Sequence, residues 1–148
     1  MIKIILNKLF GKRNVIVDKN TKENNGLIED EVSSNKNSGY RNEVKEKYDF
    51  DLPASDTDKI LLGNNFENAG DIEKACACYE GCVQNRFKGN GPYDRLIILY
   101  KNLDRPDDIL RIVKKAISIF EKVTKQGRSD GAKKLEKYKS QLERITGD

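Results

Sequence analysis

The stretch from residue 59 to residue 83 decides the fold, and it reads KILLGNNFENAGDIEKACACYEGCV. Gly70 and Asp71 divide it, because glycine permits the backbone conformation that ends a helix and aspartate caps the start of the next one. Apolar residues recur at helical spacing on both sides of this break. The first segment carries Ile60, Leu61, Leu62 and Phe66, and the second carries Ile72, Ala75, Cys78, Tyr79, Cys82 and Val83 along one side. The stretch therefore predicts two helices joined by a tight turn.

The same alternation of start signals and apolar stripes continues towards the end of the chain. Pro92 opens a third helix and Pro106 a fourth, since proline is tolerated in the first helical turn. A fifth helix follows the break at residues 127–131. The core positions of these three helices are Leu96, Ile97, Leu99, Tyr100 and Leu103; Ile109, Ile112, Val113, Ala116, Ile117 and Phe120; and Ala132, Leu135, Tyr138, Leu142 and Ile145. Residues 55–148 are therefore predicted to form an all-α domain.

The helical segments repeat with a period of 34 residues. This offset places Leu62 over Leu96, Phe66 over Tyr100, Tyr79 over Val113 and Cys82 over Ala116. In a repeat protein each pair of helices cannot bury its apolar face alone, so neighbouring pairs stack on one another.

These positions resemble the tetratricopeptide repeat (TPR) family, whose first helix carries an aromatic, Leu-Gly and a second aromatic. The second helix of that family carries an alanine and, four residues later, an aromatic. The first repeat matches at Leu62, Gly63, Phe66, Ala75 and Tyr79, with Lys59 in place of the leading aromatic; the second matches at Tyr93, Leu96 and Tyr100 but deviates at Ile97, Ile109 and Val113.

The resemblance implies antiparallel helical hairpins stacked as a short TPR-like α-solenoid, with two repeats and a C-terminal capping helix. An unrelated helical bundle with coinciding apolar stripes is the alternative, because periodicity alone does not separate helical folds. Two repeats are fewer than the three that such stacks usually need. The last helix or a second subunit must then cover the open end, so weak homo-oligomerisation is plausible.

The resemblance also implies that the first helix of each repeat lines a groove that binds a partner protein. The side chains expected there are Asn64, Glu67 and Asn68 from the first repeat and Asp94, Arg95, Ile98, Lys101 and Asn102 from the second. Relatives that grip a partner's carboxylate use a lysine where this chain has Ile60, so that clamp is not expected. Arg95 remains able to pair with a partner's carboxylate. An ordinary solvated face is the alternative for every one of these residues.

The first 54 residues divide into two predicted regions. Residues 1–13 form a short basic amphipathic helix, and residues 14–54 are rich in Asn, Lys, Glu, Ser and Asp, which predicts a disordered polar linker with at most a weak helix at 42–48. The apolar face of the first helix carries Ile2, Ile5, Leu6, Leu9 and Phe10. This face suits an anionic membrane surface, the open end of the repeat or a partner protein equally well.

The sequence offers no set of residues that points to catalysis. It has no histidine, the side chain used most often as a general base. The three cysteines, Cys76, Cys78 and Cys82, lack the paired spacing and the fourth ligand of a zinc site and are interpreted as small core residues. The glycines of segment 88–92 lack the lysine and Ser or Thr of a phosphate loop. No catalytic residue, metal or cofactor is expected.

Charge and hydropathy add predictions about partners and location. The net charge is +4, and from Arg111 onward eleven Lys and Arg stand against five Asp and Glu. Interleaved acidic residues make a solvated helix face a better interpretation of this basic end than a nucleic-acid site. The three cysteines are too close together to join distant parts of the chain by disulfides, and this usage, with the lack of a long apolar run, suits the cytoplasm.

The predicted function is that of a non-enzymatic adaptor that binds a peptide or helix of a partner protein. The alternative is an accessory protein that contacts a membrane surface or nucleic acid through its basic N-terminal helix or C-terminal helices.

Overall fold

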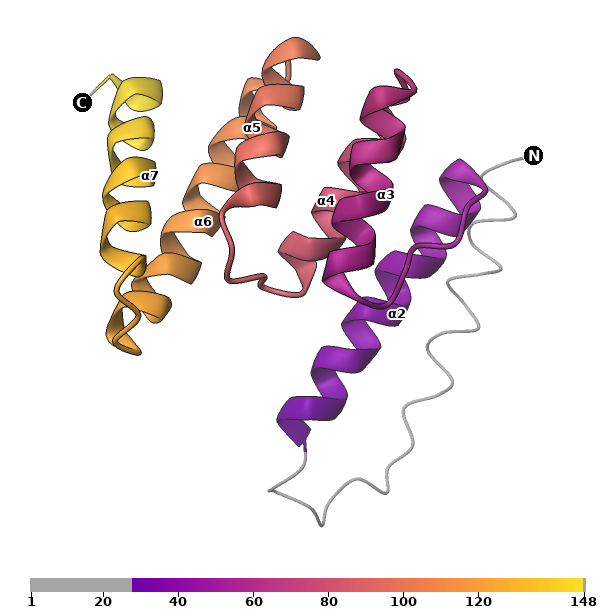
Figure 1. Cartoon of the computed structure of the whole chain (residues 1–148), viewed down its shortest axis with the longest axis horizontal. Helices are drawn as coiled ribbons and strands as arrows, with labels where there is room; N and C mark the ends of the chain where they lie inside the picture. Colours follow the sequence, from indigo (N-terminus) through magenta and orange to yellow (C-terminus); the bar gives the residue numbers. More distant parts are fainter. Residues whose placement is uncertain (1–27, 148) are drawn as a thin grey trace, which may run out of the picture. The chain divides into compact units, whose positions relative to one another are not determined.

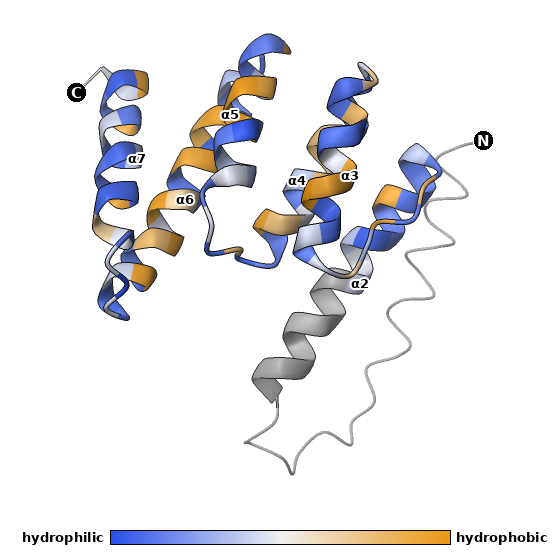
Figure 2. Cartoon of the chain, in the orientation of Figure 1, coloured by the Kyte–Doolittle hydropathy of each residue, from blue (hydrophilic) through white to orange (hydrophobic). Residues whose placement is uncertain are grey.

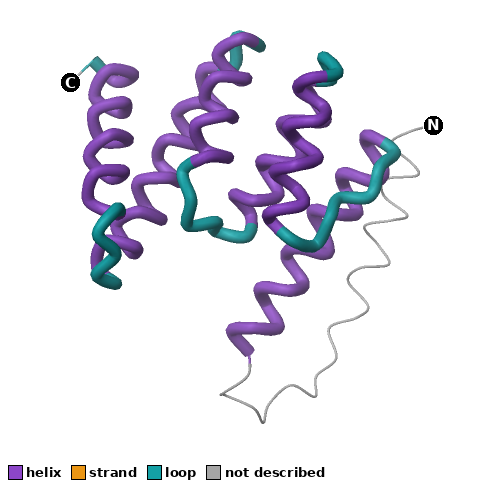
Figure 3. The backbone as a smooth tube through the Cα atoms, viewed as in Figure 1, coloured by secondary structure: helices purple, strands orange, loops and turns teal. Residues whose placement is uncertain are grey.

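The computed structural model describes residues 28–147, with side chains from residue 38 onward. These residues hold six α-helices and no strand, so the all-α prediction is confirmed for them (Figure 1; Figure 3). The helices are α2 (Ile28–Tyr48), α3 (Asp56–Asn68), α4 (Ile72–Gln84), α5 (Gly91–Asn102), α6 (Pro106–Lys125) and α7 (Gly131–Thr146). None of them is long and apolar enough to cross a membrane. The predicted basic helix at residues 1–13, with Ile2, Ile5, Leu6, Leu9 and Phe10, lies outside the described residues.

Helix α3 begins and ends at the cap and turn residues that the sequence indicates. The Ser55 side chain accepts a hydrogen bond from the Asp58 amide at 3.2 Å, which satisfies one free donor at the start of α3. Gly70, with φ of 81°, follows α3 in the left-handed conformation. In the turn after α4, Arg86 takes the left-handed position, with φ of 55°. A residue with a Cβ is strained there.

The helices from α3 to α7 pack in chain order, each against the next, and successive helices run in opposite directions (Figure 1). Polar contacts also join alternate helices. Glu67 on α3 pairs with Arg95 on α5, and Glu80 on α4 pairs with Arg111 on α6. The chain therefore alternates between a row of α3, α5 and α7 and a second row that contains α4 and α6.

The main apolar core lies between α4, α5, α6 and α7 (Figure 2). Three aromatic rings form its centre, with the Tyr93 ring centroid 5.9 Å from that of Phe120 and 6.4 Å from that of Tyr138. Phe120 and Tyr138 stack at 5.6 Å. All three are fully buried. Each contributes on the order of 2–3 kcal/mol by burial, so α7 is an integral part of the core.

Helix α4 is buried on all sides along residues 75–83. The sequence interprets all three cysteines of this helix as core residues, and Cys76 is accordingly 3 % exposed, but Ala77, which the sequence leaves off the apolar side, is also buried at 4 %. Ala77 is buried because residues from α2 and the segment after it cover the second side of α4, whereas Cys76 packs in the main apolar core.

The predicted linker at residues 14–54 differs most from the structure in its described part, residues 28–54, while residues 14–27 lie outside the described residues. Residues 28–48 form α2, and Val44 and Leu52 are each 2 % exposed in a second apolar cluster with Ala77 and Cys78. The Tyr40 hydroxyl donates to the carbonyl oxygen of Ala77 at 2.9 Å. Composition suggested disorder because the apolar residues are few. Tyr40, Val44 and Tyr48 nevertheless recur every four residues, which is a helical stripe.

Candidate partner-binding surface

The residues predicted to line a groove lie on two neighbouring helices. Asn64, Glu67 and Asn68 belong to α3, and the remainder belong to α5: Asp94, Arg95, Ile98, Lys101 and Asn102. The ion pair between Glu67 and Arg95 joins the two helices. The structure thus brings the eight residues onto adjacent elements, but it uses some of them for contacts within the chain.

Glu67 and Arg95 are engaged with each other. Arg95 Nε donates to Glu67 Oε1 at 3.0 Å, and Arg95 Nη2 donates to Glu67 Oε2. Burial by itself would raise the pKa of Glu67, but hydrogen bonds from Arg95 and Tyr79 outweigh it and hold that pKa below its ordinary value. The charge of Arg95 is therefore neutralised within the chain, where the sequence left it available for a partner's carboxylate.

Asp94 and Asn64 also serve the packing of the chain. Asp94 accepts hydrogen bonds from the Tyr138 hydroxyl and from Lys137 Nζ, each at 2.8 Å, and so attaches α7 to α5. Asn64 Oδ1 accepts from the Tyr79 hydroxyl at 2.6 Å and links α3 to α4, although Asn64 itself is exposed. Both residues position helices, which sequence spacing did not indicate.

The predicted residues that remain open to solvent form what we call the α3–α5 surface: Asn64, Asn68, Ile98, Lys101 and Asn102. Ile98 is 45 % exposed. The side chains of Asn68, Lys101 and Asn102 make no hydrogen bond or ion pair within the described part of the chain. This surface therefore presents three amide side chains and a cation around an exposed apolar residue.

One apolar residue of α3 lies outside the core, contrary to expectation. Leu61, which the sequence assigned to the apolar face of its helix, is 60 % exposed. Its neighbours Ile60 and Leu62 pack against the two apolar clusters. Three consecutive apolar residues span about 200° of a helix, so one of them had to face solvent.

A cleft of about 350 Å³ lies over α4, with walls from α2 and from the end of α5 and the start of α6. Glu80, only 8 % exposed, stands in it and accepts a hydrogen bond from the Tyr100 hydroxyl at 2.6 Å. Arg111 donates to both carboxylate oxygens of Glu80 and also pairs with Asp108 at 2.9 Å. Burial, then the negative charge of Glu80, raises the pKa of Tyr100. These contacts lock α4, α5 and α6 together.

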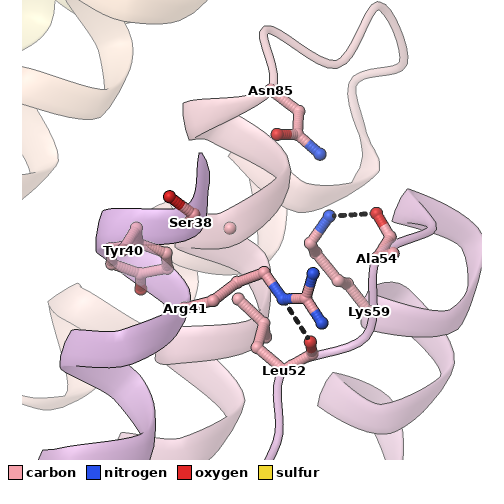
Figure 4. A pocket seen from close by; sticks show the side chains of 8 residues that line it. Ser38, Tyr40, Arg41, Leu52, Ala54, Lys59 and Asn85 are labelled. Atoms are coloured by element: carbon pink, nitrogen blue, oxygen red, sulfur yellow. Dashed lines mark hydrogen bonds between the residues drawn. The ribbon is translucent and has the colours of Figure 1, made fainter. Parts of the chain in front are cut away.

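A smaller cavity of about 240 Å³ lies between α2, α3 and α4 (Figure 4). Arg41 Nε donates to the Leu52 carbonyl oxygen at 3.0 Å, and Lys59 Nζ donates to that of Ala54 at 2.9 Å. Lys59 is 3 % exposed and also pairs with Asp56 at 2.9 Å. The two cations therefore fix the segment between α2 and α3.

Lys59 stands in a core position because its neighbour is a glycine. A Cβ at Gly81 would lie 3.0 Å from Lys59 Cδ and 2.9 Å from Leu52 Cδ2. The aliphatic stem of Lys59 thus packs on bare backbone while its ammonium reaches polar partners, which is how long cationic side chains are buried.

The three cysteines are buried free thiols. Burial raises the pKa of Cys76, Cys78 and Cys82 to about 12 each, so they carry no thiolate at neutral pH. In the described residues, no group of three or more His, Cys, Asp or Glu side chains is placed to hold a metal ion.

Comparisons with known proteins find no relative of this chain. No family model matches the chain, and no curated protein or solved structure matches it either.

Proposed function

We propose that this chain is a non-enzymatic, cytoplasmic protein-binding module of the tetratricopeptide type, a short α-solenoid whose α3–α5 surface binds a peptide or helix of a partner protein. The observation that carries the proposal is the exposed Ile98 among amide side chains on two helices already tied by the Glu67–Arg95 pair. The motif residues support the assignment, because Gly63 and Tyr79 lie where α3 and α4 meet closely and Ala75 is fully buried on α4.

The chemistry of the surface suits a peptide main chain. Asn68 and Asn102 each offer one acceptor and two donors, which match the carbonyl and amide groups of a peptide, and Asn64, whose oxygen already accepts from Tyr79, offers its amide donors. Ile98 supplies an apolar contact, and Lys101 adds a charge at the margin. Because the helices are held by internal ion pairs and aromatic packing, little ordering accompanies binding, which favours affinity.

The test compares two isoleucines of similar exposure. Ile98 is 45 % exposed on α5, and Ile145, which the sequence assigned to the core, is 43 % exposed on α7. Wild-type, Ile98→Asp and Ile145→Asp chains are immobilised and exposed to a lysate of the source cells. The proteins that each chain retains at moderate salt are identified by mass spectrometry. The expected result is a partner that the wild-type and Ile145→Asp chains retain and the Ile98→Asp chain loses. The affinity of the Ile98→Asp chain for this partner should be about tenfold or more below that of the wild type.

Equal retention by all three chains would remove the α3–α5 surface from the proposal. Arg95 is a poor choice for this experiment, because replacing it breaks the ion pair with Glu67 and confounds binding with stability.

A further inference from the structure

Two loops distant in the sequence meet at one end of the helices. The connection from α4 to α5 and that from α6 to α7 both lie at the lower end in Figure 3. Lys88 Nζ donates to Gln126 Oε1 at 3.2 Å, and Arg128 Nη1 donates to the Lys88 carbonyl oxygen at 3.5 Å. These two contacts hold the loops together.

The two loops and the end of α6 carry four exposed cationic side chains. We call Lys88, Lys122, Lys125 and Arg128 the basic end; all four are exposed. Arg128 pairs with Asp130 at 2.8 Å, but the three lysines form no ion pair with any described carboxylate. The carbonyl groups at the end of α6 favour nearby lysines, and this accounts for Lys122 and Lys125. It does not account for Lys88, which reaches the same place from another loop.

We propose that the basic end binds an acidic segment of a protein partner, rich in Asp or Glu. The surface is short and bounded by Glu121 on α6 and by Asp130 before α7. A phosphate backbone running across it would pass both carboxylates, whereas a few clustered carboxylates fit between them. Uncompensated lysines attract such a segment at long range and speed its association. This site is separate from the α3–α5 surface.

The experiment measures fluorescence anisotropy of a labelled glutamate-rich peptide with the full chain at low and moderate salt. A peptide with glutamine in place of glutamate and a labelled DNA duplex serve as comparison probes. The test variant is Lys88→Glu with Lys125→Glu. The matched control is Lys114→Glu with Lys115→Glu, two exposed lysines on α6 that change the net charge equally, from +4 to 0.

The wild-type chain is expected to bind the glutamate peptide. The test variant should bind it about tenfold more weakly or worse, and the affinity of the control variant should change by less than about twofold. Binding should weaken with salt, and Ile98→Asp should leave it unchanged. Failure of wild type to bind the peptide, or equal losses in both double variants, overturns the proposal. Tighter binding of the duplex, lost in the test variant alone, would assign the basic end to nucleic acid instead.

Discussion

At Gly63, the lack of a side chain sets how closely α3 and α4 approach. A Cβ at this position would lie 2.8 Å from Tyr79 Cε1 and 2.9 Å from Tyr79 Cζ. The Tyr79 ring is fully buried, and its hydroxyl is held by Asn64, so the ring has little room to move. The small residue is therefore a requirement of packing rather than of backbone conformation.

Gly63→Ala is expected to destabilise the protein by about 1–2 kcal/mol. Overpacking of a core costs roughly 1–3 kcal/mol, and the better helix propensity of alanine offsets up to about 1 kcal/mol of this. The matched control is Gly39→Ala, because a Cβ at Gly39 within α2 meets nothing within 4 Å. Urea unfolding should show the control at or above wild-type stability. Equal stability of the two variants would mean that the contact with Tyr79 carries no strain.

The thiols are expected to be unreactive in the folded protein. Because burial raises the pKa of all three cysteines to about 12, a thiol reagent at neutral pH should label them only after unfolding. Mass spectrometry of iodoacetamide-treated protein, native and in urea, measures this directly. Rapid labelling of Cys78 without denaturant would contradict the packing of α2 and Leu52 over it.

At the scale of elements, the segment from Tyr40 to Leu52 completes the domain. Val44 and Leu52 cover Ala77 and Cys78, and Phe50 lies edge-on to Phe66 with ring centroids 5.1 Å apart. Without this segment one side of α4 would face water.

A chain trimmed to residues 55–148 should therefore be less stable than one trimmed to residues 38–148. Losing the burial of Val44 and Leu52 costs on the order of 3–6 kcal/mol, at roughly 1.5–3 kcal/mol for each side chain. Thermal melting followed by circular dichroism compares the two fragments, and faster labelling of Cys78 in the shorter one is a second readout. Identical melting temperatures would show that α2 contributes nothing to the domain.

At the scale of the whole molecule, acid should weaken the fold through its paired carboxylates. The pKa of Glu67 lies below its ordinary value of 4.5 because hydrogen bonds from Arg95 and Tyr79 outweigh burial. A lowered pKa in the folded state contributes stability that is complete above the ordinary value and is lost as the pH falls below it. The pKa of Asp108 is also lowered, since hydrogen bonds from Arg111 and Arg105 outweigh burial.

Glu67→Gln should accordingly lower stability at neutral pH and flatten its decline between about pH 5 and pH 3. Melting temperatures measured across this range for the variant and wild type test the expectation. Glu46→Gln, on an exposed α2 residue with no ion pair to the described residues, is the control and should keep the wild-type profile. Parallel curves for Glu67→Gln and wild type would assign the acid sensitivity to other carboxylates.

Local sequence signals were enough to predict the helices from α3 to α7, because helix ends depend on short-range chemistry: Ser55 caps α3, Pro106 starts α6 and Gly70 ends α3. The residues that the sequence proposed for a partner-binding surface lie on α3 and α5. Which of those side chains remain open to solvent depends on contacts between helices that are far apart in the sequence. Glu67 and Arg95 are 28 residues apart, and Asp94 and Tyr138 are 44 apart. Such pairings depend on how the helices pack, which no local pattern specifies, and for the same reason α2 joined the domain despite its polar composition.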